Sequence, residues 1–412
     1  MDHRDSLFPT LKHLTAQDNI RTPAGDRIYR EEILALVLRH CKEVAQRTAL
    51  ATVTKAVVAL PAWYTSLDCE AVRVAARLAG FAVQLVNEQV AAAIAYAYEC
   101  EEFERGYTLV ADLGAGAFNV AVVLVEGHQN THNFVISAIG GKNHLGGDAF
   151  TARLADHVGK LTNLPPGGLR AAGQKAIRLL ANGESYSIEV DDRPFEFTRD
   201  VVLDACQPLL QEIRDTIQST LDSINLPRDK LASALLIGGA SPTTGFEDAV
   251  TEVIGRRASI VHLFNRPELV ACGAVHVGYG RAKPAPVLCR SIQLQVKDQV
   301  LQLGRQNEPL PTSHHGEIHT TIDNHESITI KVYEMDGSNP LLLQKFSVRP
   351  LPSGPVQLQV TVWIDSDGTR EITVKATIQQ VTKLVTSPTF TEEELGRMGL
   401  ETNRRYSTLH PR

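Results

Sequence analysis

The sequence predicts a chain of two parts, an α/β domain followed by an antiparallel β-sandwich. Three observations predict this division. Strand-like and helix-like segments alternate from Arg30 to about Tyr279, which is typical of an α/β fold. A proline-rich connector, Arg281–Val287, then indicates an extended linker. Beyond it, short alternating strands separated by turn residues predict a sandwich of about 100 residues.

The elements of the α/β part are predicted from local periodicity. Apolar residues at helical spacing predict a helix over Glu31–Thr48, and Gly80 is placed to stop a second helix over Asp68–Ala79. Short apolar runs predict strands at Lys55–Leu60, Val83–Val86 and Leu235–Gly239. The other expected helices are Val90–Tyr98, Ala149–Leu161, Leu169–Ala181, Arg199–Ile224 and Phe246–Gly255.

The second part alternates apolar and polar residues with a period of two, which predicts half-buried strands. We expect loops at His314–Ile318 and Asp336–Pro340, and one short helix, Glu392–Met398, in a polar tail. The expected strands are Ile292–Val296, Ile318–Ile322, Ile328–Tyr333, Leu343–Val348, Val356–Ile364 and Ile372–Ala376.

Composition excludes several classes of protein. The 412 residues carry a formal net charge of -6, which gives no global basic field for binding nucleic acid. No apolar run is long enough to span a bilayer, and the N-terminus lacks the apolar core of a signal peptide. The six cysteines are scattered singly, so neither a zinc site nor a disulfide framework is indicated. We therefore expect a cytosolic protein without a membrane segment.

The segment Val110–Gly127 is the strongest functional signal in the chain. An apolar run ends in Asp112, a tight turn follows at Gly114–Gly116, and a second β-rich run begins at Val120. Glycine permits backbone N–H groups to approach a phosphate, and an acid at the mouth of the turn suits a hydrated Mg²⁺. The alternative is an ordinary glycine-rich hairpin turn.

Five motifs in order resemble the ATPase domain of the 70-kDa heat-shock chaperone family, in the actin/hexokinase-like superfamily. The similarity extends from about Tyr29 to Tyr279, and the following β domain resembles that family's peptide-binding sandwich. The resemblance implies an actin-like (ribonuclease-H-like) fold for the α/β part. The motifs are Val57–Tyr64, Ala79–Tyr98, Asp112–Val120, His144–Phe150 and Leu235–Pro242.

The resemblance also implies a set of site residues for ATP or ADP with Mg²⁺. Asp112 and Glu88 would be the catalytic acids that organise the metal, through water, and the attacking water. Pro61 would couple nucleotide state to the connector. Glu88 also suits a helix cap, Arg178 a solvated helix position, and the glycines near Gly238 a strand-to-helix turn. The implied nucleotide-binding residues are Gly114, Ala115, Gly116, Gly146, Gly147, Arg178, Gly238 and Gly239.

Departures from the family pattern predict impaired hydrolysis. The family's first phosphate-binding hairpin and its lysine have no counterpart before Arg30, so we expect an N-terminally incomplete ATPase domain. Ala117 stands where the family has threonine, and Asn119 where it has aspartate. Neither side chain can orient an attacking water as the family's residues do. Cys69 replaces the arginine that works with Pro61.

These features predict a domain organisation and a function. We expect an irregular segment (1–29), a nucleotide-binding domain (30–280), a linker (281–290), a sandwich (291–380) and a tail without a helical lid (381–412). The shape resembles the lid-less, ribosome-associated branch of the family. It implies a chaperone or cochaperone that assists folding of unfolded or nascent polypeptides with a J-domain partner. The alternatives are a non-enzymatic scaffold, or an isoform fragment of an active ATPase chaperone.

Overall fold

Contacts divide the chain into two compact units. Unit 1 comprises Met1–Leu60, Tyr64–Leu85 and Pro286–Arg412, and unit 2 comprises Pro61–Trp63 and Val86–Ala285. The domain boundaries expected from the sequence stay a prediction. The computed structural model describes residues 20–21, 27–61, 64–100, 103–126, 133–190, 193–263, 266–285, 287–288, 290–319, 327–336, 339–348, 357–364, 370–376, 379–385 and 392–409.

Unit 2 is built on a five-stranded mixed sheet with the order β11-β10-β5-β6-β7. Strands β5, β6 and β7 are antiparallel neighbours, whereas β10 and β11 run parallel to β5. The hairpin predicted around Asp112 is therefore confirmed as β5–β6. The strands are β5 (Gly106–Leu113), β6 (Phe118–Glu126), β7 (Asn133–Lys142), β10 (Leu231–Ile237) and β11 (Ser259–His262).

Helices on this sheet follow the predicted order. The sequence did not predict α8, the short strand β11, or the hairpin of β8 (Tyr186–Val190) and β9 (Arg193–Phe197). Helices α3 and α8 approach closely, because a Cβ added at Gly273 would stand 1.8 Å from the Ala91 carbonyl oxygen. The helices are α3 (Glu88–Glu99), α4 (Gly147–Thr162), α5 (Pro166–Ala181), α6 (Arg199–Asp222), α7 (Phe246–Ile254) and α8 (Leu269–Gly278).

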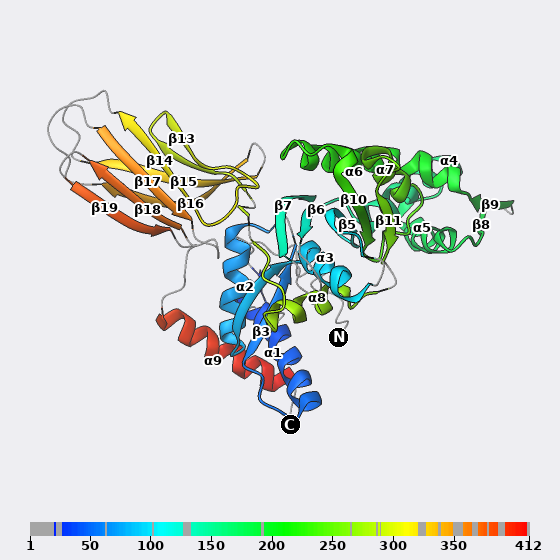
Figure 1. Ribbon diagram of the computed structural model, residues 1–412. Helices are drawn as coiled ribbons and strands as arrows, with labels where there is room; N and C mark the ends of the chain where they lie inside the picture. Colours follow the sequence, from blue (N-terminus) through cyan, green and yellow to red (C-terminus); the bar gives the residue numbers. More distant parts are fainter. Residues whose placement is uncertain are drawn as a thin grey trace. The chain divides into compact units, whose positions relative to one another are not determined.

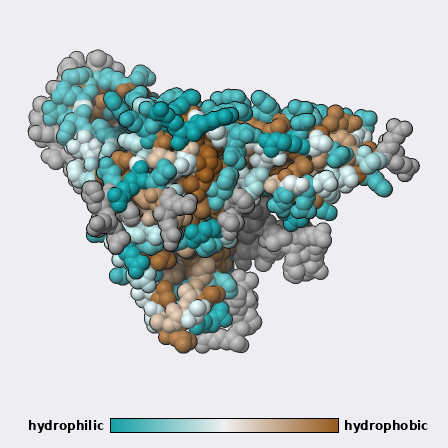
Figure 2. Space-filling view, turned by 45° about the vertical axis from the view of Figure 1, so that its right-hand side comes forward, coloured by the Kyte–Doolittle hydropathy of each residue, from teal (hydrophilic) through white to brown (hydrophobic). Residues whose placement is uncertain are grey.

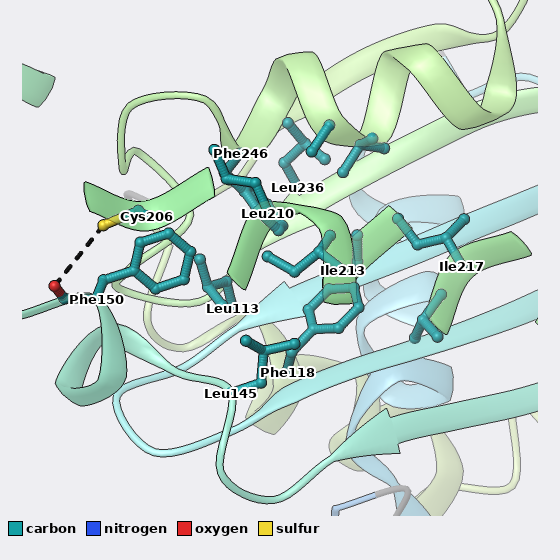
Figure 3. Close-up of a cluster of buried hydrophobic side chains, with 14 of the residues drawn as sticks. Leu113, Phe118, Leu145, Phe150, Cys206, Leu210, Ile213, Ile217, Leu236 and Phe246 are labelled. Atoms are coloured by element: carbon teal, nitrogen blue, oxygen red, sulfur yellow. Dashed lines mark hydrogen bonds between the residues drawn. The ribbon is translucent and has the colours of Figure 1, made fainter. Parts of the chain in front are cut away.

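The core of unit 2 lies between the sheet and helices α4, α6 and α7 (Figure 3). Phe118 of β6 is fully buried and meets Phe246 of α7 edge to face, with ring centroids 6.0 Å apart. Cys206 of α6 is also fully buried, and its thiol lies 3.8 Å from the carbonyl oxygen of Phe150. This packing holds the turn after β5 and the helices around it in fixed positions.

Unit 1 contains a small helical part. Helix α9 continues to Leu409, beyond the end predicted at Met398, because Met398 and Thr402 are buried where α9 packs on α1 and α2 (Figure 1). Strands β3 and β4 form a two-stranded sheet, and β1 pairs with β2. The elements are β1 (Ile20–Arg21), β2 (Arg27–Ile28), α1 (Arg30–Ala49), β3 (Lys55–Leu60), α2 (Ser66–Leu78), β4 (Ala82–Asn87) and α9 (Glu392–Leu409).

The predicted sandwich forms the other part of unit 1, as two four-stranded antiparallel sheets. Their orders are β13-β12-β15-β16 and β14-β17-β18-β19. The part of its surface visible in Figure 2 is mostly hydrophilic, as expected for strands with one face toward the core. The strands are β12 (Ile292–Val296), β13 (Gln299–Gly304), β14 (Thr312–His319), β15 (Ile328–Asp336), β16 (Asn339–Val348), β17 (Gln357–Ile364), β18 (Arg370–Ala376) and β19 (Gln379–Val385).

Two details of the sandwich differ from the sequence prediction. The segment His314–Ile318 belongs to β14 and is not a loop, because it pairs along its whole length with β17. Strands β13 and β19 were not predicted, and β19 lies in the segment expected to be a polar tail. Ile318 and Val332 are buried in the core, and Ile322 lies outside the described residues.

Candidate functional site

Asp112 stands near the end of β5, where the hairpin turn begins. Its register partner on β6 is Asn119, so the two side chains are cross-strand neighbours. The turn is closed by the Gly114 N–H, which donates to the Ala117 carbonyl oxygen at 3.0 Å. Among the described residues, no hydrogen bond uses the N–H groups of Ala115, Gly116 or Ala117. A turn with unused N–H groups is suited to hold an anion.

The second glycine pair packs directly on this turn. Gly147 and Asp148, at the start of α4, donate their N–H groups to the carbonyl oxygens of Gly114 and Ala115, at 3.0 Å and 2.8 Å. A Cβ added at Gly146 would stand 2.5 Å from the Ala115 oxygen and from the Ala117 nitrogen. The Gly147 N–H thus already has an acceptor in the turn, and Gly146 and Gly147 stabilise the turn by packing on it.

The third glycine pair follows β10. Gly238 has a φ of +88°, and a Cβ there would stand 2.4 Å from the Leu113 oxygen and 2.5 Å from Asp112 Oδ1. The Ala240 N–H donates to the same Leu113 oxygen at 3.0 Å. Gly239 has no heavy atom within 4 Å of its added Cβ. Gly238 therefore permits the close approach of β10 to β5, and Gly239 borders open space.

Helix α3 brings a residue to Asp112 that the sequence did not predict. Asn87 caps the helix by accepting from the N–H groups of Gln89 and Val90. The Gln89 side chain is fully buried, and its Nε2 donates to Asp112 Oδ2 at 2.9 Å. Glu88, the first residue of α3, is half-buried. The contact joins residues 23 positions apart in the chain, which no local sequence pattern predicts.

Two buried oxygen atoms near this contact have no hydrogen-bond partner within the described part of the chain. They are Gln89 Oε1 and Asn119 Oδ1, on side chains that are 0% and 4% exposed. A Cβ added at Gly141 would stand 2.9 Å from Asn119 Oδ1, so the neighbouring strand β7 approaches this atom closely. The inner end of the site is therefore rich in acceptors and poor in charge.

The remaining predicted residues are not joined to this cluster. Arg178 lies in the last turn of α5, and no hydrogen bond or ion pair among the described residues connects it to the glycine turns. Pro61 is buried directly after β3, and Cys69 lies on α2. The predicted functions of Arg178 and Pro61 stay predictions.

The residues present fit a phosphate better than a divalent metal ion. The turn at Ala115–Ala117 offers backbone donors, whereas Asp112 already accepts from an amide and Asn119 has no charge. In the part of the chain that the structure describes, no group of three or more His, Cys, Asp and Glu side chains could hold a metal ion. Within the same residues, no helix is both long and apolar enough to cross a membrane.

Comparisons with known proteins agree with the motifs. A family model described as Hsp70 protein matches residues 10–406. The chaperone protein DnaK from one strain of Thermus thermophilus is 28% identical over 435 residues, covering 93% of this chain and 68% of the relative. DnaK from a second strain of the same organism is 27% identical with the same coverage.

Proposed function

Because this chain belongs to the Hsp70 family, a family of chaperones, we propose that it holds unfolded polypeptides without an efficient cycle of ATP hydrolysis. The family has an actin-like ATPase fold, so the α/β part has that fold and the antiparallel sandwich follows it. A chaperone role follows from the family and from the DnaK relatives. The weak hydrolysis is the part that this proposal adds.

The observation that carries the proposal is the chemistry around Asp112. Hydrolysis of a phosphoanhydride needs an oriented water and stabilised charge on the phosphoryl oxygens. Ala117 has no hydroxyl, and Asn119 is neutral with its Oδ1 buried and without a partner among the described residues. Asp112 accepts a hydrogen bond from the Gln89 amide. An amide cannot act as a general base that takes a proton from the attacking water. The arrangement supports phosphate binding without rapid turnover.

Nucleotide binding in this proposal depends on backbone groups. The unused N–H groups of Ala115, Gly116 and Ala117 would contact phosphate oxygens, and Gly239 would face the nucleoside. The Hsp70 family binds ATP or ADP with Mg²⁺, and a bound Mg²⁺ would supply charge to the phosphate oxygens. Since Asp112 Oδ2 already accepts from the Gln89 amide, we assign no step to that ion.

The partners follow from the family and are proposed for this chain. They are a J-domain cochaperone and unfolded or nascent polypeptides, with the ribosome as a place of action in the cytosol. The sandwich would bind extended peptide with rapid release, because the described residues after it form α9, which packs on α1 and α2. Without a helix held over the peptide, affinity falls through a short residence time.

Steady-state ATP hydrolysis by the purified chain tests the proposal. We expect turnover below detection, with the same background in Asp112→Ala. A normal chaperone rate that Asp112→Ala abolishes would contradict the proposal. Thermal unfolding with and without ATP then separates a nucleotide-binding chaperone from a scaffold, because ligand at a hundred times Kd stabilises the folded state by about 2.7 kcal/mol.

Peptide binding is tested by fluorescence anisotropy with a labelled apolar heptapeptide and a matched acidic heptapeptide as the control. We expect weak binding of the apolar peptide alone, with dissociation complete within seconds. Dissociation over minutes would show that the sandwich retains substrate in a way that the fast-release proposal excludes. No binding of the apolar peptide would favour the scaffold alternative.

A further inference from the structure

We propose that the Gln89 side-chain amide takes the place on Asp112 that a hydrated divalent cation would use, so that this site functions without such a cation. The inference rests on the proposed function in placing a phosphate site beside Asp112. It makes Gln89 a positioning residue, since its side chain acts on Asp112 and not on a substrate.

The contact has the geometry of a specific hydrogen bond to a charged group. Gln89 Nε2 and Asp112 Oδ2 are 2.9 Å apart, and the Gln89 side chain is fully buried. An N–H donor and a metal-bound water both donate to carboxylate lone pairs, so the amide occupies an acceptor position that such a water would use. The amide is part of the chain at the start of α3. Its contact with Asp112 therefore loses no translational entropy, as the binding of a free ion would.

The backbone after β10 lies close to the other Asp112 oxygen. Asp112 Oδ1 lies where a Cβ on Gly238 would come within 2.5 Å, so the backbone after β10 covers this side of the carboxylate. Asn119, opposite on β6, adds a carbonyl oxygen and no charge. A hydrated divalent ion that retains its waters needs open space beside its carboxylate, and at Asp112 the Gln89 amide and the backbone after β10 take up part of that space.

The neighbouring acid does not replace Gln89 at this contact. The hydrogen bond from α3 to Asp112 Oδ2 comes from Gln89, and adjacent residues on a helix project about 100° apart around its axis. The first turn of α3 thus presents a neutral donor to Asp112. The unpartnered Gln89 Oε1 fits this assignment, because the amide is oriented by its nitrogen, toward the carboxylate.

The test converts the donor into an acceptor without changing its shape. Gln89→Glu places a carboxylate against Asp112, and two carboxylates at this separation repel each other unless a metal ion or a shared proton lies between them. Gln84→Glu, at an exposed position on β4, is the matched control for added charge. The double variant Gln89→Glu with Asp112→Asn leaves one carboxylate, so the pair of facing carboxylates is absent. The probe is Mn²⁺ alone, followed by its electron paramagnetic resonance signal and by thermal unfolding.

The expected result is specific to Gln89→Glu. The wild-type chain and Gln84→Glu should leave the Mn²⁺ signal and the unfolding temperature unchanged at millimolar Mn²⁺. Gln89→Glu should unfold at a lower temperature in chelator, bind one Mn²⁺, and regain wild-type stability with it. The double variant should lose that response. If Gln89→Glu does not fold in chelator, refolding in Mn²⁺ gives the same readout.

Two results would overturn the inference. One is an Mn²⁺ site in the wild-type chain that Asp112→Asn removes. The other is a Gln89→Glu variant that matches the wild type in both stability and Mn²⁺ response, which would show that the two side chains are not in contact. Because neither measurement contains nucleotide, a failure of ATP to bind refutes the proposed nucleotide site and leaves this result unaffected.

Discussion

Replacing Gly238 with alanine should destabilise unit 2 through two separate effects. The position has a φ of +88°, a left-handed conformation that costs an L-residue about 1 to 2 kcal/mol. The new Cβ would also stand 2.4 Å from the Leu113 oxygen and 2.5 Å from Asp112 Oδ1. Overpacking of this kind typically costs about 1 to 3 kcal/mol. We therefore expect the free energy of unfolding of unit 2 to fall by about 3 kcal/mol.

Gly239→Ala is the matched control, because its added Cβ meets no heavy atom within 4 Å. Its effect should stay within about 0.5 kcal/mol. For a unit of about 200 residues, a loss of about 3 kcal/mol lowers Tm by about 6 to 12 °C. Circular dichroism gives the unfolding temperature, and hydrogen exchange of the β5 and β10 peptides localises the change. Equal stability of the two variants would show that β10 does not approach β5 as the structure describes.

Three further predictions concern single buried groups. Glu334→Ala should lower the free energy of unfolding, measured in urea, by about 1 to 2 kcal/mol, because the buried Glu334 carboxylate accepts from the Ser66 N–H at the start of α2. Glu334→Gln should lower it less. Burial raises the pKa of the Cys206 thiol to about 12, so iodoacetamide at mildly alkaline pH should modify the exposed Cys41 and spare Cys206 in the native chain, as read by mass spectrometry. Burial also raises the pKa of Glu32 above its unfolded value, so its contribution to stability is present at acid pH and declines as pH rises through the folded pKa. Glu32→Gln should therefore gain stability relative to wild type as pH rises above the ordinary glutamate pKa of 4.5, and a constant difference would contradict this.

Local pattern predicted most helices and strands because their signals lie within a few residues. The alternation of apolar residues around Asp112 and the glycines of the turn predicted the β5–β6 hairpin. The helices of unit 2 from α4 to α7 follow from a period near 3.6 with one apolar face, and α3 follows from an alanine-rich run whose residues Gln89–Ala97 are all buried. Elements with weaker periodicity, such as β13 and β19, were missed because their pairing partners, and not their own residues, make them strands.

The candidate site was only partly predictable. The glycine turns and Asp112 were found from residue type, and the hydrogen bonds from Gly147 and Ala240 bring the three glycine pairs together. The use of the Gly147 N–H by the turn was not predictable, since it depends on where α4 begins relative to β5. The same applies to Gln89, which lies 23 positions before Asp112 in the sequence.

The sequence by itself determined the order of most helices and of the longer strands, the glycine positions and the losses at Ala117 and Asn119, because these depend on residue type and short-range periodicity. Only the tertiary structure decided which partner each polar group has. It extended α9 to Leu409 by burying one face of that helix against α1 and α2. It also directed the Gln89 amide to Asp112. Such contacts join segments far apart in the chain, and their energies depend on distances of a few ångströms that no local pattern encodes.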